Sequence, residues 1–153
     1  MKDVETEFSV NGKRYNLMFN LNVLQAIQVE YGTFNNWISL VDGFVHDENG
    51  EKKVKLDSSG NPITEKVKDE NGKEIEVNVY EKRETDIKAL IFGLKEVINE
   101  AIDVANEEKN LNEPFLNERQ VGRIITALGI ANATNKMQEA IVNGTGIENS
   151  KNE

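Results

Sequence analysis

The stretch FSVNGKRYNLMFNLNVLQAIQVEYGTFNNW, residues 8–37, decides the fold that we predict for this chain. Its first part alternates apolar and polar residues on both sides of Asn11-Gly12, which is the strongest short signal for a β-hairpin. The spacing of apolar residues then changes from two to between three and four, as in a helix, and the pattern stops at Gly32. The stretch therefore predicts a hairpin followed directly by a helix.

A two-residue type I′ turn at Asn11-Gly12 fixes the register of this hairpin. It places mostly apolar or β-branched residues on one face, in the pairs Val10–Lys13, Phe8–Tyr15, Thr6–Leu17 and Val4–Phe19. The other face is expected to meet solvent and contains Glu5, Glu7, Ser9, Arg14, Asn16 and Met18. Turn chemistry and alternation agree, so the register follows from local sequence.

Helical spacing recurs along the rest of the chain. The expected helices cover residues 21–31, 34–41, 87–105, 117–128 and 132–142. Their predicted caps are Asn20 or Asn22, Thr33 or Asn35, Thr85 or Asp86, and Asn117, while Gly129 and Gly144 are expected to end the last two helices. Gly93 interrupts the longest apolar stripe, and close approach of another helix would explain it.

Residues 42–83 have a different texture, with few large apolar residues. Three glycine turns, at Asn49-Gly50, Ser59-Gly60 and Asn71-Gly72, separate short β-like runs and predict a β-meander. For the last turn we prefer a three-residue loop, Glu70–Gly72, because it pairs Val67 with Ile75 and Ile63 with Val79, whereas a two-residue loop would mix the faces. This segment is expected to project from the core as a hairpin arm.

The predicted fold class is therefore α+β: an N-terminal β-hairpin packed with four to five helices, plus the inserted arm. Its 153 residues and 38% hydrophobic content suit one core, so we expect a single domain over residues 1–144, with the arm at 42–83 and a flexible tail at 145–153. The net charge of -9 argues against a nucleic-acid partner. No apolar window reaches membrane-spanning length, so no membrane partner is expected.

Motifs for catalysis, cofactor binding or metal ligation are not found in the sequence, and we expect no catalytic, cofactor or metal site. There is no cysteine, and the single histidine, His46, is expected to be a solvated turn residue rather than a metal ligand. No serine stands beside a histidine in the sequence, which disfavours Ser–His catalysis. An enzyme is therefore not expected.

Two apolar groups are candidates for binding a partner, although burial in the core is the more common role of such residues. The first is the aromatic cluster Tyr31, Phe34 and Trp37, because aromatic residues are enriched at interface hot spots. The second belongs to the stripe of the longest helix and comprises Ile91, Leu94 and Ile98.

Three blocks of the chain resemble the tail assembly chaperones of long-tailed phages and prophages of Gram-positive bacteria. These blocks are residues 8–37, TDIKALIFGLKEVINEAIDVANEE (85–108) and FLNERQVGRIITALG (115–129). The matching features are the strand–Asn-Gly–strand hairpin, the helix ending in Tyr31-Gly32 and the segment Gln120–Arg123. The arm is longer than the common pattern of the family.

The resemblance implies a non-enzymatic protein of the host bacterial cytoplasm. It would bind the tape-measure protein, keep its apolar helices soluble and help recruit tail-tube subunits, and self-association stays open. The alternative is a structural tail or head–tail connector subunit, in which the arm would interlock subunits. The family provides no residue-level binding site that transfers to this chain.

Overall fold

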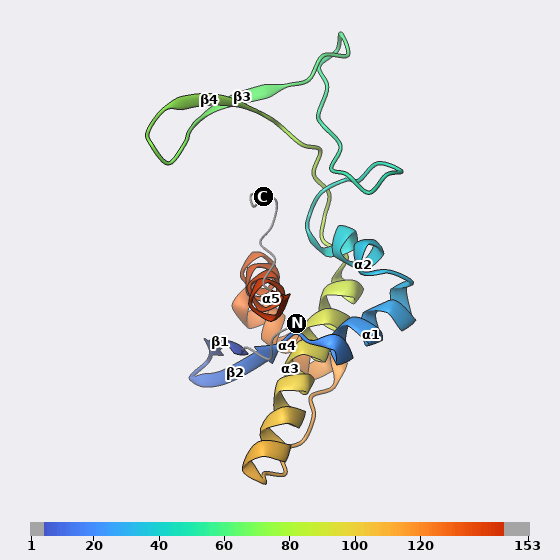
Figure 1. The fold of residues 1–153 in the computed structure, drawn as a ribbon, viewed down its shortest axis with the longest axis vertical. Helices are drawn as coiled ribbons and strands as arrows, with labels where there is room; N and C mark the ends of the chain where they lie inside the picture. Colours follow the sequence, from blue (N-terminus) through green and yellow to red (C-terminus); the bar gives the residue numbers. More distant parts are fainter. Residues whose placement is uncertain (1–4, 146–153) are drawn as a thin grey trace.

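The computed structural model describes residues 5–145 and has an α+β architecture of two separate antiparallel hairpins and five helices (Figure 1). The predicted fold class is thus confirmed. The elements in chain order are β1 (Glu5–Val10), β2 (Lys13–Met18), α1 (Leu21–Tyr31), α2 (Phe34–Val41), β3 (Thr64–Lys68), β4 (Glu74–Asn78), α3 (Ile87–Lys109), α4 (Glu118–Leu128) and α5 (Ile130–Thr145).

The first hairpin has the predicted register. Phe8 pairs with Tyr15, their rings stack with centroids 5.5 Å apart, and Asn11 and Gly12 have the positive φ angles, 52° and 79°, of a type I′ turn. The fourth predicted pair, Val4–Phe19, lies outside the described residues. The prediction that the other face of the hairpin meets solvent is wrong at Met18. This side chain is buried where β2 enters the body of the protein.

The helix ends follow mainly from local capping chemistry. Of the paired alternatives, Asn20, Thr33 and Asp86 are the residues that cap α1, α2 and α3. Asn117 caps α4 through a reciprocal capping box with Gln120, as predicted. Three boundaries were predicted wrongly: α3 continues to Lys109, and α5 both begins earlier, at Ile130, and ends later, at Thr145, past Gly144.

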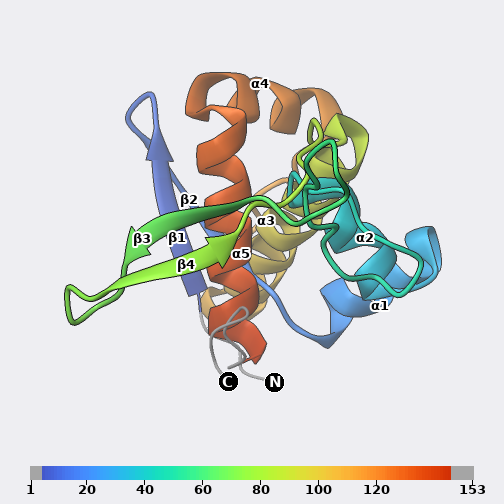
Figure 2. The ribbon, with the colours of Figure 1, turned by 90° about the horizontal axis from the view of Figure 1, so that it is seen from above.

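Helix α3 occupies the centre of the body, with β2 and α5 on one side and α1 and α2 on the other (Figure 2). Helix α5 covers β1, and α4 packs against both α3 and α5. The fully buried large side chains of this core are Leu17, Phe19, Val23, Ile27, Trp37, Val41, Leu90, Leu94, Val97, Ile98, Val121 and Met137.

Two helical glycines allow this close packing. A Cβ on Gly93 would overlap the indole ring of Trp37 and lie 2.8 Å from Met137 Sδ, so the predicted close approach at Gly93 is confirmed. The approaching groups are side chains from α2 and α5. A Cβ on Gly144 would overlap the carbonyl oxygen of Phe19. Gly144 therefore lets α5 lie directly on the chain that leaves β2, and it does not end the helix as predicted.

The segment between Gly43 and Arg83 extends away from the body as an arm (Figure 1). It ends in the β3–β4 hairpin, where the predicted pairing of Val67 with Ile75 is confirmed. Before that hairpin two side branches leave the stem, and each is closed by one bridge, His46–Lys52 in the first and Leu56–Pro62 in the second. The predicted meander is therefore a branched stem.

All three branches end in the same loop. Each loop begins at an aspartate whose Oδ1 accepts hydrogen bonds of 2.8–3.0 Å from two backbone N–H groups, two and four residues later. A glycine with φ of 79° to 84° supplies the left-handed position, as expected for three-residue loops with a glycine bulge. The three loops are Asp47–Glu51, Asp57–Asn61 and Asp69–Lys73.

Closed rings of backbone hydrogen bonds join the branches to the stem. In the first ring Val45 N–H donates to Glu81 O, Glu81 N–H to Lys53 O, and Lys53 N–H to Val45 O, at 2.9–3.0 Å. The second ring repeats this pattern at 2.7–2.9 Å with Lys55, Val79 and Ile63. Each ring satisfies three donors and three acceptors, so the backbone needs no wider sheet at the branch points.

Candidate functional site

An apolar groove lies between the start of α3 and the end of α4. It encloses about 390 Å³ and is lined by Ile87, Ile91, Gly122, Ile125, Thr126, Gly129 and Ile130. Two of its isoleucines remain substantially exposed, Ile87 at 44% and Ile130 at 46%. Grooves of this kind accept the apolar face of a helix or another apolar segment.

The sequence of α4 shapes the floor of this groove. Gly122 has no side chain there, and a Cβ at that position would lie 3.8 Å from Ile91 Cδ1, at ordinary contact distance. The hydroxyl of Thr126 donates to the Gly122 carbonyl oxygen at 2.9 Å. The one polar side chain of the lining thus satisfies its donor within α4, so an apolar ligand would leave no polar side chain of the groove without a partner.

The structure divides the six residues predicted from sequence as partner-binding. Trp37, Leu94 and Ile98 are at most 1% exposed, so they form the core and offer no surface to a partner. This corrects their assignment, and the reason is that α1, α2, β2 and α5 pack against α3. Only Ile91 of the α3 group lies in the groove.

Tyr31 and Phe34 are half-buried members of an aromatic cluster. The Tyr31 ring meets the edge of Phe92 at 5.4 Å, and Phe34 contacts Phe19 and Trp37 with centroids at 5.9 and 5.6 Å. Burial raises the pKa of the Tyr31 hydroxyl, and the charges of Asp86 and Glu30 raise it further. These contacts stabilise the junction of α1, α2 and α3 and lie apart from the groove.

Sequence reasoning missed Ile130. The sequence predicts a stop at Gly129 and a next helix from residue 132, which places Ile130 in the connection between them. In the structure Gly129 separates two helices that follow each other directly. The signal was present, because Ile130 stands three residues before the buried Ala133 and seven before the buried Met137.

His46 is not the solvated turn residue that was predicted. Its side chain is 15% exposed and joins the arm to the end of α2: Nε2 lies 2.9 Å from Asp42 Oδ2, and Nδ1 lies 3.0 Å from the carbonyl oxygen of Gly50. Within residues 5–145 no group of three or more His, Asp or Glu side chains is arranged to hold a metal ion. Helices of the length and apolarity needed to cross a membrane are likewise not found in that range.

Comparison of the chain with protein-family models, with curated proteins and with solved structures finds no match.

Proposed function

We propose that this chain is a non-enzymatic binding protein of phage tail assembly, a chaperone that covers apolar helical segments of a tape-measure protein. The observation that supports this role is the groove between α3 and α4, in which the exposed Ile87 and Ile130 flank an apolar floor. The sequence resemblance described above supplies the biological setting. In this role the protein acts in the host bacterial cytoplasm and helps to recruit tail-tube subunits.

The groove suits such a partner for a physical reason. Long apolar helices aggregate unless their apolar faces are covered, and an open groove covers one face reversibly. The net charge of -9 keeps the complex soluble through mutual repulsion. The chaperone therefore combines a local apolar contact with a charged exterior.

The direct test is co-expression of the chain with the tape-measure protein, followed by affinity capture. Ile87→Lys and Ile130→Lys each place a charge in the groove and should abolish capture. Val29→Lys is the matched control, because Val29 is also an exposed apolar residue, at 81%, but lies on α1. Capture that is equal for all three variants and the parent chain would reject the groove as the binding surface.

A second candidate function is a structural tail or head–tail connector subunit. The projecting arm favours it, since its β3–β4 hairpin has two unpaired edges and could interlock with a neighbouring subunit. Mass spectrometry of purified particles separates the two roles. A chaperone is absent from the finished particle, whereas a connector is present in a fixed ratio to the tube subunit.

A further inference from the structure

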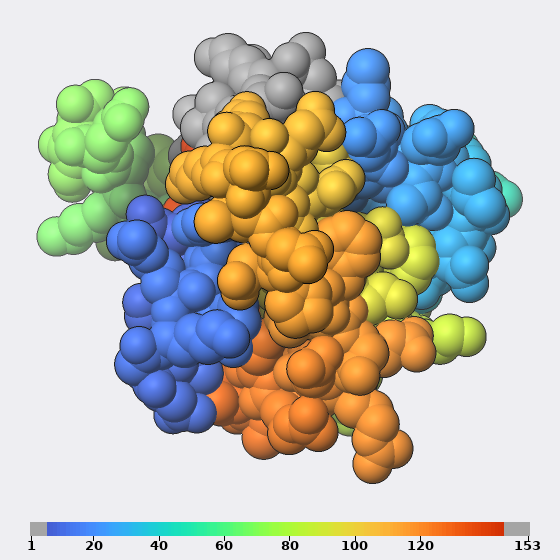
Figure 3. Space-filling model, turned by 90° about the horizontal axis from the view of Figure 1, so that it is seen from below, coloured from blue at the N-terminus to red at the C-terminus, as the bar shows by residue number. Residues whose placement is uncertain are grey.

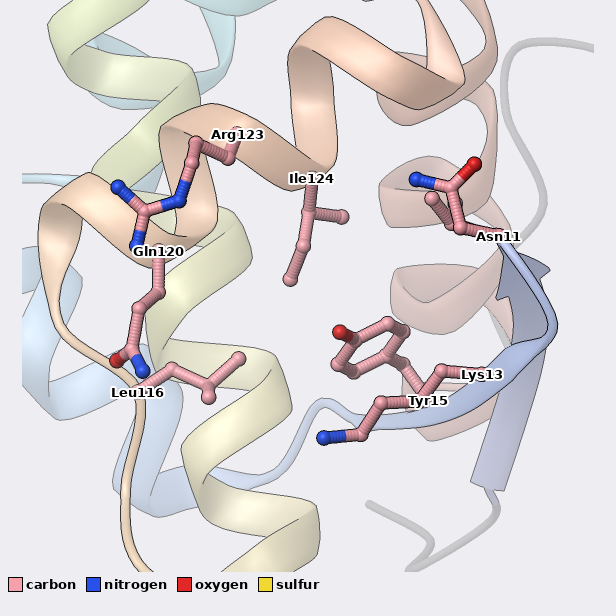
Figure 4. A pocket seen from close by; sticks show the side chains of 8 residues that line it. Asn11, Lys13, Tyr15, Leu116, Gln120, Arg123 and Ile124 are labelled. Carbon is pink, nitrogen blue, oxygen red and sulfur yellow. The ribbon is translucent and has the colours of Figure 1, made fainter.

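A second pocket lies between the tip of the first hairpin and the start of α4. It encloses about 460 Å³ and is lined by Val10, Asn11, Lys13, Tyr15, Leu116, Gln120, Arg123 and Ile124 (Figure 4). Seen from below, the hairpin lies beside the loop and the helix that follow α3 (Figure 3). On α4 the lining positions fall on the side of the helix opposite the apolar groove, because Gln120, Arg123 and Ile124 are out of phase with Gly122, Thr126 and Gly129.

Strand and helix geometry arrange the polar groups of this pocket in two pairs, one on the hairpin and one on α4 (Figure 4). Lys13 and Tyr15 are two residues apart on β2, so both side chains leave the same face of the hairpin. Figure 4 shows the Tyr15 hydroxyl pointing from the hairpin toward Ile124, while the Lys13 side chain runs past the Tyr15 ring and ends below it. Gln120 and Arg123 are three residues apart and are neighbours on the surface of α4.

The pocket is cationic although the protein is acidic. Its lining contains Lys13 and Arg123 but no Asp or Glu, in a chain with 27 acidic residues. In the part of the chain that the structure describes, neither cation forms an ion pair, and the neighbouring Arg14 pairs instead with Glu7 at 3.3 Å. Two unpaired cations that face one pocket favour an anionic ligand.

The hydrogen-bond donors of the pocket match a carboxylate. The Oε1 atom of Gln120 accepts from the backbone N–H of Asn117 at 2.7 Å, which leaves its Nε2 group as a donor. Arg123 adds a planar fork of donors suited to a carboxylate, and Tyr15 adds a hydroxyl. Lys13 provides a mobile positive charge whose Nζ lies 5.4 Å from the centre of the Tyr15 ring.

Apart from Asn11 of the hairpin turn, the remaining lining is aliphatic and selects against highly charged ligands. Val10, Leu116 and Ile124 supply apolar surface, and Ile124 is only 6% exposed. A polyanion such as nucleic acid would meet the repulsion of the net charge of -9. A single carboxylate beside an apolar side chain uses both kinds of surface and meets the least repulsion.

We propose that this pocket binds a carboxylate that stands next to an apolar side chain in a partner polypeptide. Arg123 and Lys13 hold the carboxylate, Gln120 Nε2 and the Tyr15 hydroxyl donate to it, and the apolar side chain contacts Leu116 and Ile124. The carboxylate comes either from an acidic side chain or from a chain terminus. The pocket is separate from the groove between α3 and α4, so the inference holds whether or not the groove binds a tape-measure protein.

Three dipeptides that differ in whether they have a carboxylate, and in where it stands, test this inference. Acetyl-Glu-Leu-amide has it on a side chain, acetyl-Gln-Leu has it at the terminus, and acetyl-Gln-Leu-amide has none. Each is titrated into the isotope-labelled full chain while NMR signals of Tyr15 and Ile124 are followed. We expect saturable shifts with at least one carboxylate peptide, with affinity about tenfold or more above that of the neutral peptide. The peptide that binds identifies the source of the carboxylate.

Three variants locate the binding. Lys13→Gln and Arg123→Gln change exposed residues, so the fold is retained. Each should lower the affinity for the carboxylate peptide about tenfold. Arg14→Gln is the matched control, because Arg14 is adjacent in sequence but lies on the opposite face of the strand, and it should leave the affinity unchanged. The proposal is overturned if the neutral peptide binds equally well, if no peptide gives saturable shifts, or if Lys13→Gln and Arg123→Gln bind like the parent chain.

Discussion

The indole Nε1 of Trp37 donates a hydrogen bond of 3.0 Å to the backbone carbonyl oxygen of Ala89, at the centre of the core. In an α-helix this carbonyl is also the acceptor for the N–H of Gly93, four residues later. The indole can share it because Gly93 has no side chain and the ring lies directly over that position. One glycine thus fixes both the orientation of Trp37 and the packing of α2 against α3.

Gly93→Ala should destabilise the protein by about 2 kcal/mol or more. Alanine has the higher helix propensity, by about 1 kcal/mol, but its methyl group would overlap Trp37 and crowd Met137. Gly122→Ala is the control, since its methyl group meets only Ile91 Cδ1 at 3.8 Å and should raise stability. Urea unfolding followed by tryptophan fluorescence measures both changes. Equal stability of Gly93→Ala and the parent chain would show that Trp37 and Met137 can shift to accommodate the methyl group.

Removal of residues 44–82, with two glycines joining Gly43 to Arg83, should leave a folded protein. The ends of the arm are already adjacent, because Arg83 N–H donates to Gly43 O at 3.0 Å, and the arm adds no residue to the main core cluster. We expect a cooperative thermal transition within about 5 °C of the parent, measured by circular dichroism. A broad, non-cooperative transition would mean that the arm supports the body.

Asp69→Ala should open the loop at the tip of the β3–β4 hairpin, because it removes the acceptor of the N–H groups of Asn71 and Lys73. Asp69→Asn keeps an oxygen at the same place and should restore the loop. Amide hydrogen exchange at Asn71 and Lys73 is expected to be faster in the alanine variant only. Protection that is unchanged by alanine would show that Gly72 alone holds the turn.

Glu96→Gln should stabilise the protein at neutral pH. Burial raises the pKa of the Glu96 carboxyl above its ordinary value of 4.5; Lys95 opposes the shift and Glu100 adds to it. The folded state therefore favours the protonated form, and ionisation above the raised pKa costs stability. The gain from glutamine is less than about 1 kcal/mol at pH 7, and it disappears as the pH falls through the folded pKa toward 4.5.

Urea unfolding of the parent and of Glu96→Gln between pH 7 and pH 4.5 measures the difference in their free energies of unfolding. Glu107→Gln is the control on the same helix, because Glu107 is exposed. A gain that persists below pH 4.5, or an equal gain from Glu107→Gln, would contradict the role of burial at Glu96.

The parts of this fold that could be predicted from sequence are those set by a few neighbouring residues. The Asn11-Gly12 turn, the Asn117–Gln120 capping box and the three-residue loop Glu70–Gly72 each specify their own backbone geometry. Met18 and Gly144 were misjudged because their burial depends on segments far away in the chain. Local alternation cannot report such contacts.

The same reason limited prediction of the candidate sites. The apolar stripe of α3 marked Ile91, Leu94 and Ile98 equally, and only packing by other elements distinguishes the one in the groove from the two in the core. The pocket around Arg123 joins residues from the hairpin and from α4, more than 100 positions apart. No sequence pattern within the hairpin or within α4 predicts that these residues line one pocket.

The rings at the branch points of the arm separate each tip from the rest of the molecule. In each ring two residues that flank a side branch are hydrogen-bonded to each other, so the chain returns to the stem after the branch. Residues inserted within a branch therefore lengthen only that branch and leave the stem and the body in place. The loop tips at Asn49 and Ser59 are therefore natural insertion points for a peptide tag or a fluorophore. A label at either tip would report the position of the arm while the groove and the pocket stay unaltered.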